Sequence, residues 1–163
     1  MYRPPVDNGV VIREEREHGA YTELYRASRL EIDEGWEREL NPVFSVSARR
    51  GGALLGAATV SRRYDRLVLD YIAVQPEFRV KGLGRALATA CADYARREGE
   101  AELWLAARTP GFFRALGAAE TGGETLLGEC LDCPDYGKDC RPIEMVIKIQ
   151  DKEGSLCQRT SSD

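Results

Sequence analysis

The chain has 163 residues, of which 43% are hydrophobic and 31% are charged, and its formal net charge at pH 7 is −4. These values predict a single globular domain, over residues 1–150, with a substantial core. No apolar run approaches the roughly 20 residues that span a bilayer, and the N-terminus lacks the apolar core of a signal peptide. We therefore expect a cytoplasmic protein with no membrane partner and no nucleic-acid partner, because an acidic chain lacks the extended basic face that nucleic acids need.

The first half of the chain carries strand patterns interrupted by one helical pattern. Tyr21, Leu24 and Tyr25 recur at helical spacing, and Gly51-Gly52 separates two apolar runs as a hairpin turn would. The expected elements, in chain order, are a strand over 10–13, a helix over 18–32, antiparallel strands over 43–48 and 53–60, and a buried strand over 67–74.

The second half begins with an amphipathic helix, in which Leu83, Leu87 and Cys91 form an apolar stripe and Gly99 provides a C-terminal cap. The remaining expected elements are a strand over 102–106, a short helix over 110–116, strands over 118–127 and 143–149, and a disordered tail over 151–163. This order predicts an α/β (α+β) fold.

A glycine-containing basic segment, residues 79–85, lies between the strand over 67–74 and the following helix. Gly82 and Gly84 allow positive φ values and a close approach of the backbone to a ligand. A helix that begins near Gly84 presents unpaired N–H groups and the positive end of its dipole. The segment therefore predicts a binding site for a small phosphorylated ligand.

Two common phosphate-binding motifs fit this segment poorly. A P-loop requires Lys followed by Ser or Thr after its last glycine, whereas Lys81 precedes both glycines. A dinucleotide fingerprint requires a third small residue where Leu87 stands, and the preceding strand follows antiparallel strands.

Residues 73–84 instead combine a strand that ends in an apolar-Val-x-Pro sequence with the pattern Arg/Gln-x-x-Gly-x-Gly/Ala. In these features the chain resembles the GNAT superfamily of N-acetyltransferases. The resemblance extends over residues 10–149, and residues 67–98 carry its specific part. It implies a mixed, mostly antiparallel sheet of about six to seven strands flanked by about four helices.

The resemblance also implies a cosubstrate, acetyl-CoA, and its binding residues. The pantetheine arm is expected to pair with the backbone of Ile72, Ala73 and Val74. The pyrophosphate is expected at the basic segment, which comprises Arg79, Val80, Lys81, Gly82, Leu83, Gly84 and Arg85.

The activity so implied is transfer of an acetyl group from acetyl-CoA to a primary amine of a small-molecule or peptide acceptor, directly within a ternary complex. Homodimers are common among the proteins that the chain resembles. The alternative is a non-catalytic acyl-CoA-binding or metal-responsive regulatory domain on the same fold.

Asp70 is the only charged residue inside the strand over 67–74, and acyl transfer needs a base that deprotonates the amine. Asp70 is therefore the candidate catalytic residue, although an ion pair with an arginine of the segment 61–63 explains it equally well. The Tyr and Asn of the family pattern are replaced by Phe113 and Ala106, so the general acid is unidentified, with Tyr136 a remote candidate.

The chain contains five cysteines. Cys130 and Cys133 have Cys-x-x-Cys spacing, and Cys140 follows, so these three thiolates are candidate ligands of a zinc ion whose fourth ligand is missing from the motif. The alternative is a set of reduced thiols. Cys91 lies on the apolar stripe of its helix and is expected in the core.

Overall fold

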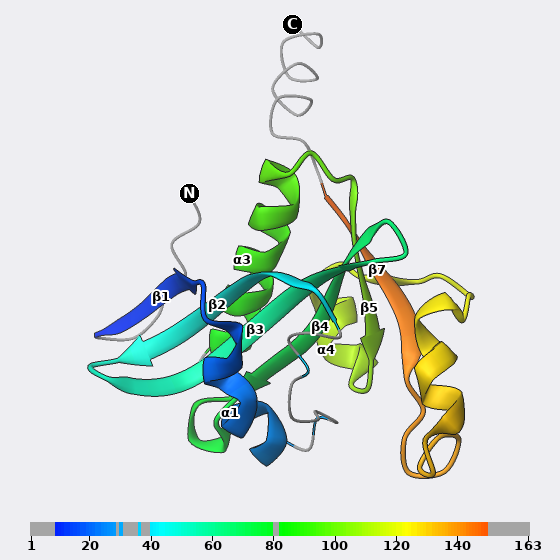
Figure 1. Cartoon of the computed structure of the whole chain (residues 1–163), viewed down its shortest axis with the longest axis horizontal. Helices are drawn as coiled ribbons and strands as arrows, with labels where there is room; N and C mark the ends of the chain where they lie inside the picture. Colours follow the sequence, from blue (N-terminus) through cyan, green and yellow to red (C-terminus); the bar gives the residue numbers. More distant parts are fainter. Residues whose placement is uncertain (1–8, 29, 31–35, 37–39, 80–81, 150–163) are drawn as a thin grey trace, which may run out of the picture. The chain divides into compact units, whose positions relative to one another are not determined.

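The computed structural model of the chain describes residues 9–28, 30, 36, 40–79 and 82–149. Its seven strands form a mostly antiparallel sheet in the order β1-β2-β3-β4-β5-β7-β6 (Figure 1), which confirms the expected fold class. The expected disordered tail lies outside the described residues.

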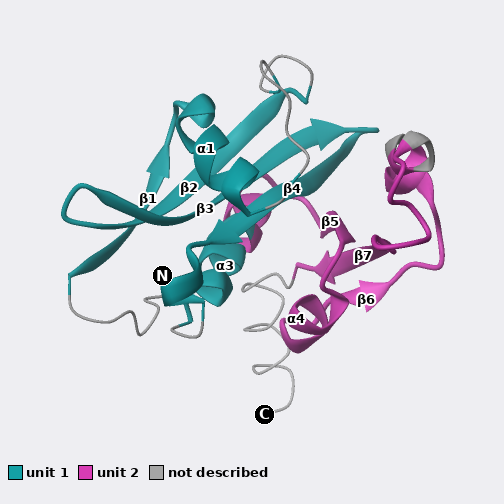
Figure 2. Ribbon diagram, turned by 90° about the horizontal axis from the view of Figure 1, so that it is seen from below, with its two compact units in different colours: residues 1–91 teal, residues 92–163 magenta. Residues whose placement is uncertain are grey.

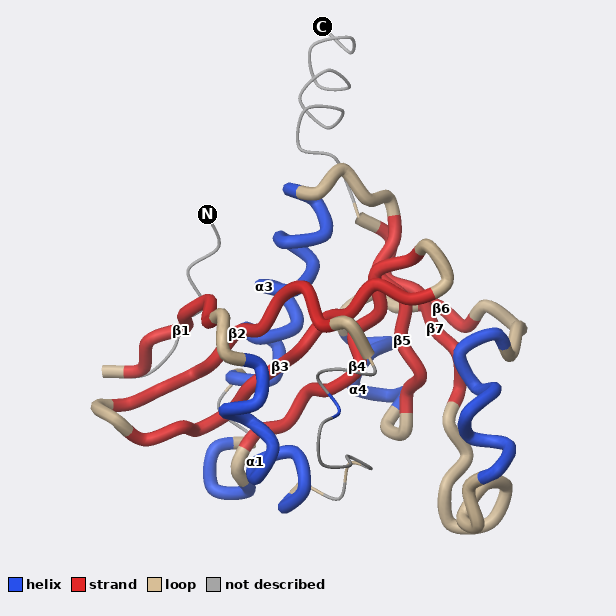
Figure 3. Tube along the Cα trace, viewed as in Figure 1, coloured by secondary structure: helices blue, strands red, loops and turns tan. Residues whose placement is uncertain are grey.

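Figure 3 shows the helices, strands and loops along the chain trace. The strands are β1 (Val10–Glu15), β2 (Pro42–Arg50), β3 (Ala53–Arg63), β4 (Arg66–Val74), β5 (Glu102–Ala107), β6 (Ala119–Glu120) and β7 (Ile143–Lys148). The described helices are α1 (Thr22–Ala27), α3 (Leu83–Arg97) and α4 (Pro110–Ala115), with 3₁₀ turns η1 (His18–Tyr21), η2 (Pro76–Phe78) and η3 (Thr125–Asp132). Among the described residues, no helix has the length and apolar composition required to cross a bilayer.

The chain divides into two compact units, residues 1–91 and 92–163 (Figure 2). The boundary falls inside α3, so the first unit contains β1 to β4 and the start of α3, and the second contains β5 to β7. The single domain expected over residues 1–150 stays a prediction.

In the first unit, β1 to β4 form an antiparallel meander. The β2–β3 hairpin turns at Gly51-Gly52, as predicted, and Gly51 has a φ of +62°. Gly56 of β3 allows α3 to pack closely, because a Cβ atom there would lie 3.0 Å from both the Ala73 carbonyl oxygen and Leu87 Cδ1. The first unit thereby brings α3 against the end of β4.

The helix predicted over 18–32 is shorter in the described residues. A 3₁₀ turn, η1, precedes α1, which ends at Ala27, and residues 29 and 31–35 lie outside the description. Tyr21 and Tyr25 are fully buried and Leu24 is 9% exposed, so the predicted apolar face is confirmed.

The predicted stripe of α3 is also confirmed, since Leu83, Leu87 and Cys91 are all buried. Gly99 ends this segment with a φ of +76°, and its N–H donates to the Arg96 carbonyl. Burial raises the pKa of the Cys91 thiol, as expected for a small core residue.

The strand predicted over 118–127 is wrong. Only Ala119–Glu120 forms a strand, and the chain then turns at Gly122, whose φ is +75°, into η3. The reason is a buried carboxylate on β7. Glu144 is 3% exposed, accepts hydrogen bonds from the Thr121 hydroxyl at 2.6 Å and the Leu126 N–H at 2.8 Å, and so holds the segment in a turn.

Candidate active site

The exit from β4 is fixed by Gln75. Its backbone N–H donates to the Leu55 carbonyl at 2.8 Å, and its side-chain Nε2 donates to the Leu54 carbonyl at 2.7 Å. These bonds extend the β3–β4 pairing beyond Val74, the last residue of β4. The three residues predicted to bind pantetheine, Ile72–Val74, therefore lie on a strand end that is held on one side.

The turn η2 leads from β4 towards the glycine segment. Phe78 N–H donates to the Gln75 carbonyl at 2.9 Å, and Arg79 Nε donates to the Val74 carbonyl at 3.1 Å. Arg79 thus bonds to the strand end itself. Val80 and Lys81, which were predicted as pyrophosphate contacts, lie outside the described residues.

Of the two glycines expected to allow positive φ values, Gly82 has one, whereas Gly84 lies inside α3 and has none. Gly82 has a φ of +78°, and a Cβ atom built there would meet nothing within 4 Å. Its carbonyl accepts the Ala86 N–H at 3.0 Å, so the first helical hydrogen bond closes at this glycine. Leu83 is buried and anchors the helix, whereas Gly82 and Arg85 are exposed. The N–H groups of the first turn of α3 begin at this exposed position, where an anion is favoured.

One cation near this turn was missed by the sequence reasoning. Arg50, at the end of β2, places its guanidinium 5.5 Å from the centre of the Phe78 ring. The two residues are 28 positions apart in the sequence, so only the hairpin pairing brings them together. The contact adds a positive charge beside the segment that leads to Gly82.

Asp70, the candidate base, occupies a β-bulge. Thr59 pairs with Tyr71 and Val60 pairs with Leu69, so Asp70 is the extra residue of β4. Its Oδ1 accepts a hydrogen bond from Arg63 Nη2 at 2.5 Å, and the two side chains are 3% and 18% exposed. The ion pair that the sequence left as the alternative therefore exists, and the base role stays a prediction.

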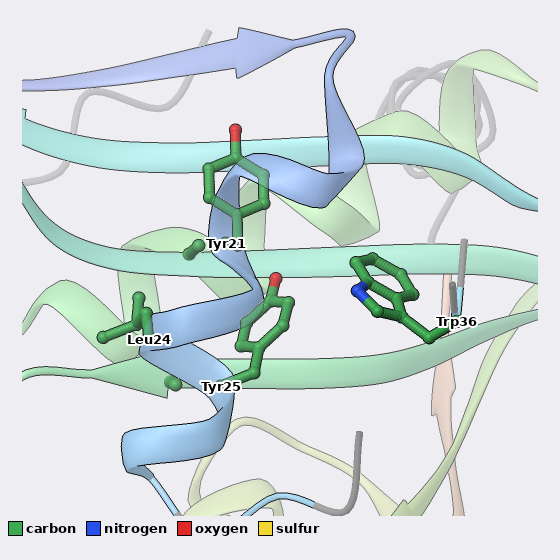
Figure 4. Packing of buried hydrophobic residues seen from close by; sticks show 6 residues of the cluster. Tyr21, Leu24, Tyr25 and Trp36 are labelled. Carbon is green, nitrogen blue, oxygen red and sulfur yellow. The ribbon is translucent and has the colours of Figure 1, made fainter. Parts of the chain in front are cut away.

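An aromatic cluster packs between α1 and β4 (Figure 4). The Tyr25 ring stacks on Tyr71 at 5.0 Å between centroids, and the Trp36 ring meets both edge-on. Tyr25 and Trp36 are buried, whereas Tyr71, next to Asp70, is partly exposed. Periodicity predicted Tyr25 in the helix but gave no indication that it contacts β4.

Beneath this cluster runs a chain of hydroxyl groups. The Tyr25 hydroxyl bonds to Thr59 Oγ1 at 2.7 Å, Thr59 to Ser45 Oγ at 2.9 Å, and Ser45 to His18 Nδ1 at 2.6 Å. Burial raises the pKa of Tyr25 well above its usual value. The chain satisfies polar groups inside the sheet and fixes the tyrosine under Tyr71.

In the second unit, Phe113 and Ala106 occupy the positions where the family pattern has Tyr and Asn. Phe113 is 6% exposed, and its ring meets Phe112 at 5.0 Å in an edge-on contact. Neither side chain can donate a proton. The general acid therefore stays unidentified, and Tyr136 stays a remote candidate.

The predicted zinc site finds no support in the structure. Cys130, Cys133 and Cys140 form no disulfide, and all three residues are partly exposed. Within residues 9–28, 30, 36, 40–79 and 82–149, no group of three or more His, Cys, Asp or Glu residues is arranged to hold a metal ion. We therefore base no function on a metal.

Known proteins share the sequence pattern and the fold of this chain. The "Streptothricin acetyltransferase" of Streptomyces lavendulae is 36% identical over 72 residues, which are 44% of this chain and 38% of that protein. The crystal structure of "Nourseothricin acetyltransferase" has a TM-score of 0.63 at 18% identity and covers 88% of this chain and 100% of its own.

N-acetylglutamate synthase from Neisseria gonorrhoeae, crystallised with coenzyme A and N-acetyl-glutamate, has a TM-score of 0.66 at 18% identity. The match covers 89% of this chain and only 36% of that protein. These structures share the fold, and their names give no support to a non-catalytic regulatory domain.

The profile of one protein family matches the chain itself over residues 12–120, from β1 to β6. This range includes the β4 exit, the Gly82 turn and all of α3. The chain therefore belongs to the Acetyltransferase (GNAT) family.

Proposed function

We propose that the protein is an acetyl-CoA-dependent N-acetyltransferase that transfers the acetyl group directly to a primary amine in a ternary complex. The observation that carries this proposal is the exposed Gly82 turn at the start of α3, which follows the Arg79 contact to the β4 end. Membership of the GNAT family identifies acetyl-CoA as the donor that this site is expected to bind.

The donor has two chemically different parts, a pantetheine arm and a pyrophosphate. The end of β4 offers a partner for the first, and the start of α3 offers one for the second. The backbone of Ile72–Val74 can pair with the amide groups of the pantetheine arm, as one strand pairs with another. The exposed N–H groups at the start of α3, with Arg85 on the same turn, suit the pyrophosphate. Val80 and Lys81 stay part of the proposed pyrophosphate contact.

Transfer requires an uncharged amine, a polarised thioester carbonyl and a stabilised leaving thiolate. In our proposal Asp70 is the base, which receives the amine proton through a water molecule. Arg63 Nη2 donates to Asp70 Oδ1 and fixes the Asp70 carboxylate in one orientation. The acetyl carbon then forms a bond to the amine nitrogen, and the bond to the sulfur of coenzyme A breaks.

The acceptor class is proposed from the relatives. One similar protein is named for streptothricin and one for nourseothricin. Because the matched stretch covers 38% of the streptothricin enzyme, its acceptor is a starting point for experiments and not an assignment. We place a small primary amine ahead of a peptide N-terminus for this reason.

The activity is tested with purified full-length chain, acetyl-CoA and a panel of amines that includes nourseothricin, amino acids and short peptides. Release of coenzyme A is followed with a thiol reagent, and acetylated products by mass spectrometry. Turnover of one amine class supports the proposal. Tight acetyl-CoA binding without turnover of any amine would favour the regulatory alternative instead.

The donor site is tested with Gly82→Val, measured by calorimetry with acetyl-CoA. A β-branched residue at a φ of +78° strains the turn, and such strain costs about 1–3 kcal/mol, or roughly 10–100-fold in affinity if binding needs this conformation. The matched control is Gly51→Val, because Gly51 also has a positive φ and open space but lies in the β2–β3 turn. Equal affinities for both variants and the parent protein would exclude the Gly82 turn as the binding site.

A further inference from the structure

The segment that contains Cys130, Cys133 and Cys140 takes no part in the proposed transfer reaction. Cys130 lies in the last turn of η3, and Cys133 follows that turn as its C-terminal cap. Neither residue is in a disulfide, and both are partly exposed, in contrast to Cys91, which is fully buried. A reagent in solution can therefore reach the first two and not Cys91.

The backbone brings Cys130 and Cys133 to disulfide distance. The Cys133 N–H donates to the Cys130 carbonyl at 3.0 Å, so the two residues close a single turn. The Cα atoms of such a turn lie less than about 7 Å apart, and disulfides join Cα atoms about 4.4–6.8 Å apart. The Cα spacing of this turn therefore suits a disulfide between the two residues.

The turn is held from both sides. On the N-terminal side, Leu126 and Leu127 are buried, and the Leu126 N–H is bound to the Glu144 carboxylate at 2.8 Å. On the C-terminal side, the Cys133 carbonyl accepts the Tyr136 N–H at 3.1 Å. A fixed turn has already lost the conformational entropy that bond formation would otherwise require.

Cys140 belongs to a different turn. Its N–H donates to the Asp135 carbonyl at 3.0 Å, and its own carbonyl accepts the Gly137 N–H at 2.8 Å. Gly137 has a φ of +80°, which closes this second turn. Cys140 is thus positioned by contacts that Cys130 and Cys133 do not share.

We propose that Cys130 and Cys133 form a reversible dithiol–disulfide pair, a modification site for two-electron thiol oxidants such as hydrogen peroxide. One thiolate attacks a peroxide oxygen, the O–O bond breaks, and a sulfenic acid and one water form after proton transfer. The second thiol attacks the sulfenic sulfur, the S–S bond forms, and the second water leaves. The two thiols are oxidised and the peroxide is reduced, and a dithiol reductant reverses the change.

Peptide mapping of the full-length chain tests the pairing. After treatment with hydrogen peroxide, free thiols are alkylated and the protein is digested with trypsin. Cleavage after Lys138 separates residues 115–138, which hold Cys130 and Cys133, from residues 139–148, which hold Cys140. We expect the first peptide to be linear, unalkylated and two hydrogens lighter, and the second to be alkylated. A cross-link between the two peptides, or alkylation of both cysteines of the first, would overturn the proposal.

The variant Cys140→Ser is expected to keep the disulfide, and Cys133→Ser to lose it. Titration in glutathione buffers then tests how much the folded structure stabilises the Cys130–Cys133 disulfide. Half of the Cys130–Cys133 pair is expected to be oxidised at a more reducing glutathione ratio in the native protein than in urea. Equal ratios in the two conditions would show that the folded turn does not stabilise the disulfide. Stoichiometric zinc that resists a chelator and protects these thiols from alkylation would also overturn the disulfide and restore the metal hypothesis.

Discussion

Each unit of the chain has a glycine turn that leads into a helical segment, and each has a carboxylate that accepts hydrogen bonds from neighbouring groups, but the two units combine these features differently. In the first unit, the Asp70 side chain bonds to Arg63, far along β4 from the Gly82 turn. In the second unit, the Glu144 carboxylate lies directly on the glycine turn. A Cβ atom at Gly123 would lie 2.9 Å from Glu144 Oε1, whereas one at Gly82 would meet nothing.

This difference separates two reasons for glycine in a turn. At Gly123, the protein supplies its own anion, which accepts the backbone N–H at the start of η3 and leaves no room for a side chain. At Gly82, the start of α3 faces open space, and the nearby charges are cationic. The Gly123 turn is therefore closed by the protein's own carboxylate, whereas the Gly82 turn has the properties of a binding site for an external anion.

The largest expected effect concerns the Asp70–Arg63 pair. Asp70→Asn leaves the partly buried Arg63 guanidinium without its charged partner, and the free energy of unfolding should fall by about 3–5 kcal/mol in urea titrations. A double variant, Asp70→Asn with Arg63→Met, removes both charges and should recover most of this loss. Arg62→Met, at an exposed position of the same strand, is the matched control.

The double variant also separates stability from catalysis. If Asp70 is the base, the stable double variant loses most of its activity, and any residual kcat no longer falls at acidic pH as the parent's does, because the group whose protonation causes that fall is absent. Full activity in the double variant would exclude the base role. Asp70 would then be a structural carboxylate that pairs with Arg63, as Glu144 is a structural carboxylate in the second unit.

The second prediction concerns Glu15, another carboxylate of the first unit that binds an arginine. Arg49 Nε donates to Glu15 Oε1 at 2.7 Å, and the bond to Arg49, together with one from Ser47, lowers the pKa of Glu15 from 4.5 to about 2. Because the folded-state pKa is the lower one, Glu15 stabilises the fold above pH 4.5, and the contribution disappears as the pH falls towards 2. The contribution of Glu15 to the free energy of unfolding is at most about 3 kcal/mol.

Urea titrations of the parent protein and Glu15→Gln between pH 2 and 7 measure this contribution as a difference, which should be constant at neutral pH and shrink in acid. Arg13→Gln is the matched control, because Arg13 is 64% exposed and lies 3.9 Å from the same carboxylate. A difference that grows in acid would contradict the sign of the pKa shift.

The third prediction tests the internal anion of the second unit. Glu144→Gln replaces one acceptor oxygen by an NH₂ group, so the Leu126 N–H or the Thr121 hydroxyl loses its partner, and stability should fall by about 1–3 kcal/mol. Acetyl-CoA affinity should not change, since the turn that we propose as the donor site is in the other unit. Thr121→Val removes the hydroxyl that donates to Glu144 and accepts the Gly123 N–H, but Gly123 is exposed and can bond to water, so this variant should cost less than Glu144→Gln. The reverse order would argue against the carboxylate as the centre of this turn.

Local signals predicted much of the first unit. The apolar run of β4, the stripe of α3 and the hairpin at Gly51-Gly52 depend on residues close in sequence, and all are confirmed. The β-branched and small residues over 118–127 suggested a strand for the same local reasons. That prediction is wrong because Glu144, 18 residues beyond Leu126, holds the segment in a turn.

In the candidate site, too, the sequence predicted features formed by neighbouring residues and missed contacts between residues that are far apart in the sequence. The glycine segment was visible because its residues are consecutive, and the Asp70–Arg63 pair was one of two alternatives because the partners are seven residues apart. The contacts of Tyr25 with Tyr71 and Thr59 and the role of Gly56 depend on strand pairing and helix packing, which no local pattern encodes.

The smallest expected effect concerns Arg50, the cation that the fold places beside the donor turn. Arg50→Gln should lower acetyl-CoA affinity by about 2–5-fold at low salt, because a partly exposed charge contributes only about 0.2–1 kcal/mol. The effect should decrease as the salt concentration rises. Arg97→Gln is the matched control, since its guanidinium lies 5.7 Å from the Tyr94 ring at the opposite end of α3. If both variants weaken binding equally, the effect reflects only the loss of one positive charge from an acidic chain. If only Arg50→Gln weakens binding, the proposed anion site at the Gly82 turn includes a residue from the β2–β3 hairpin.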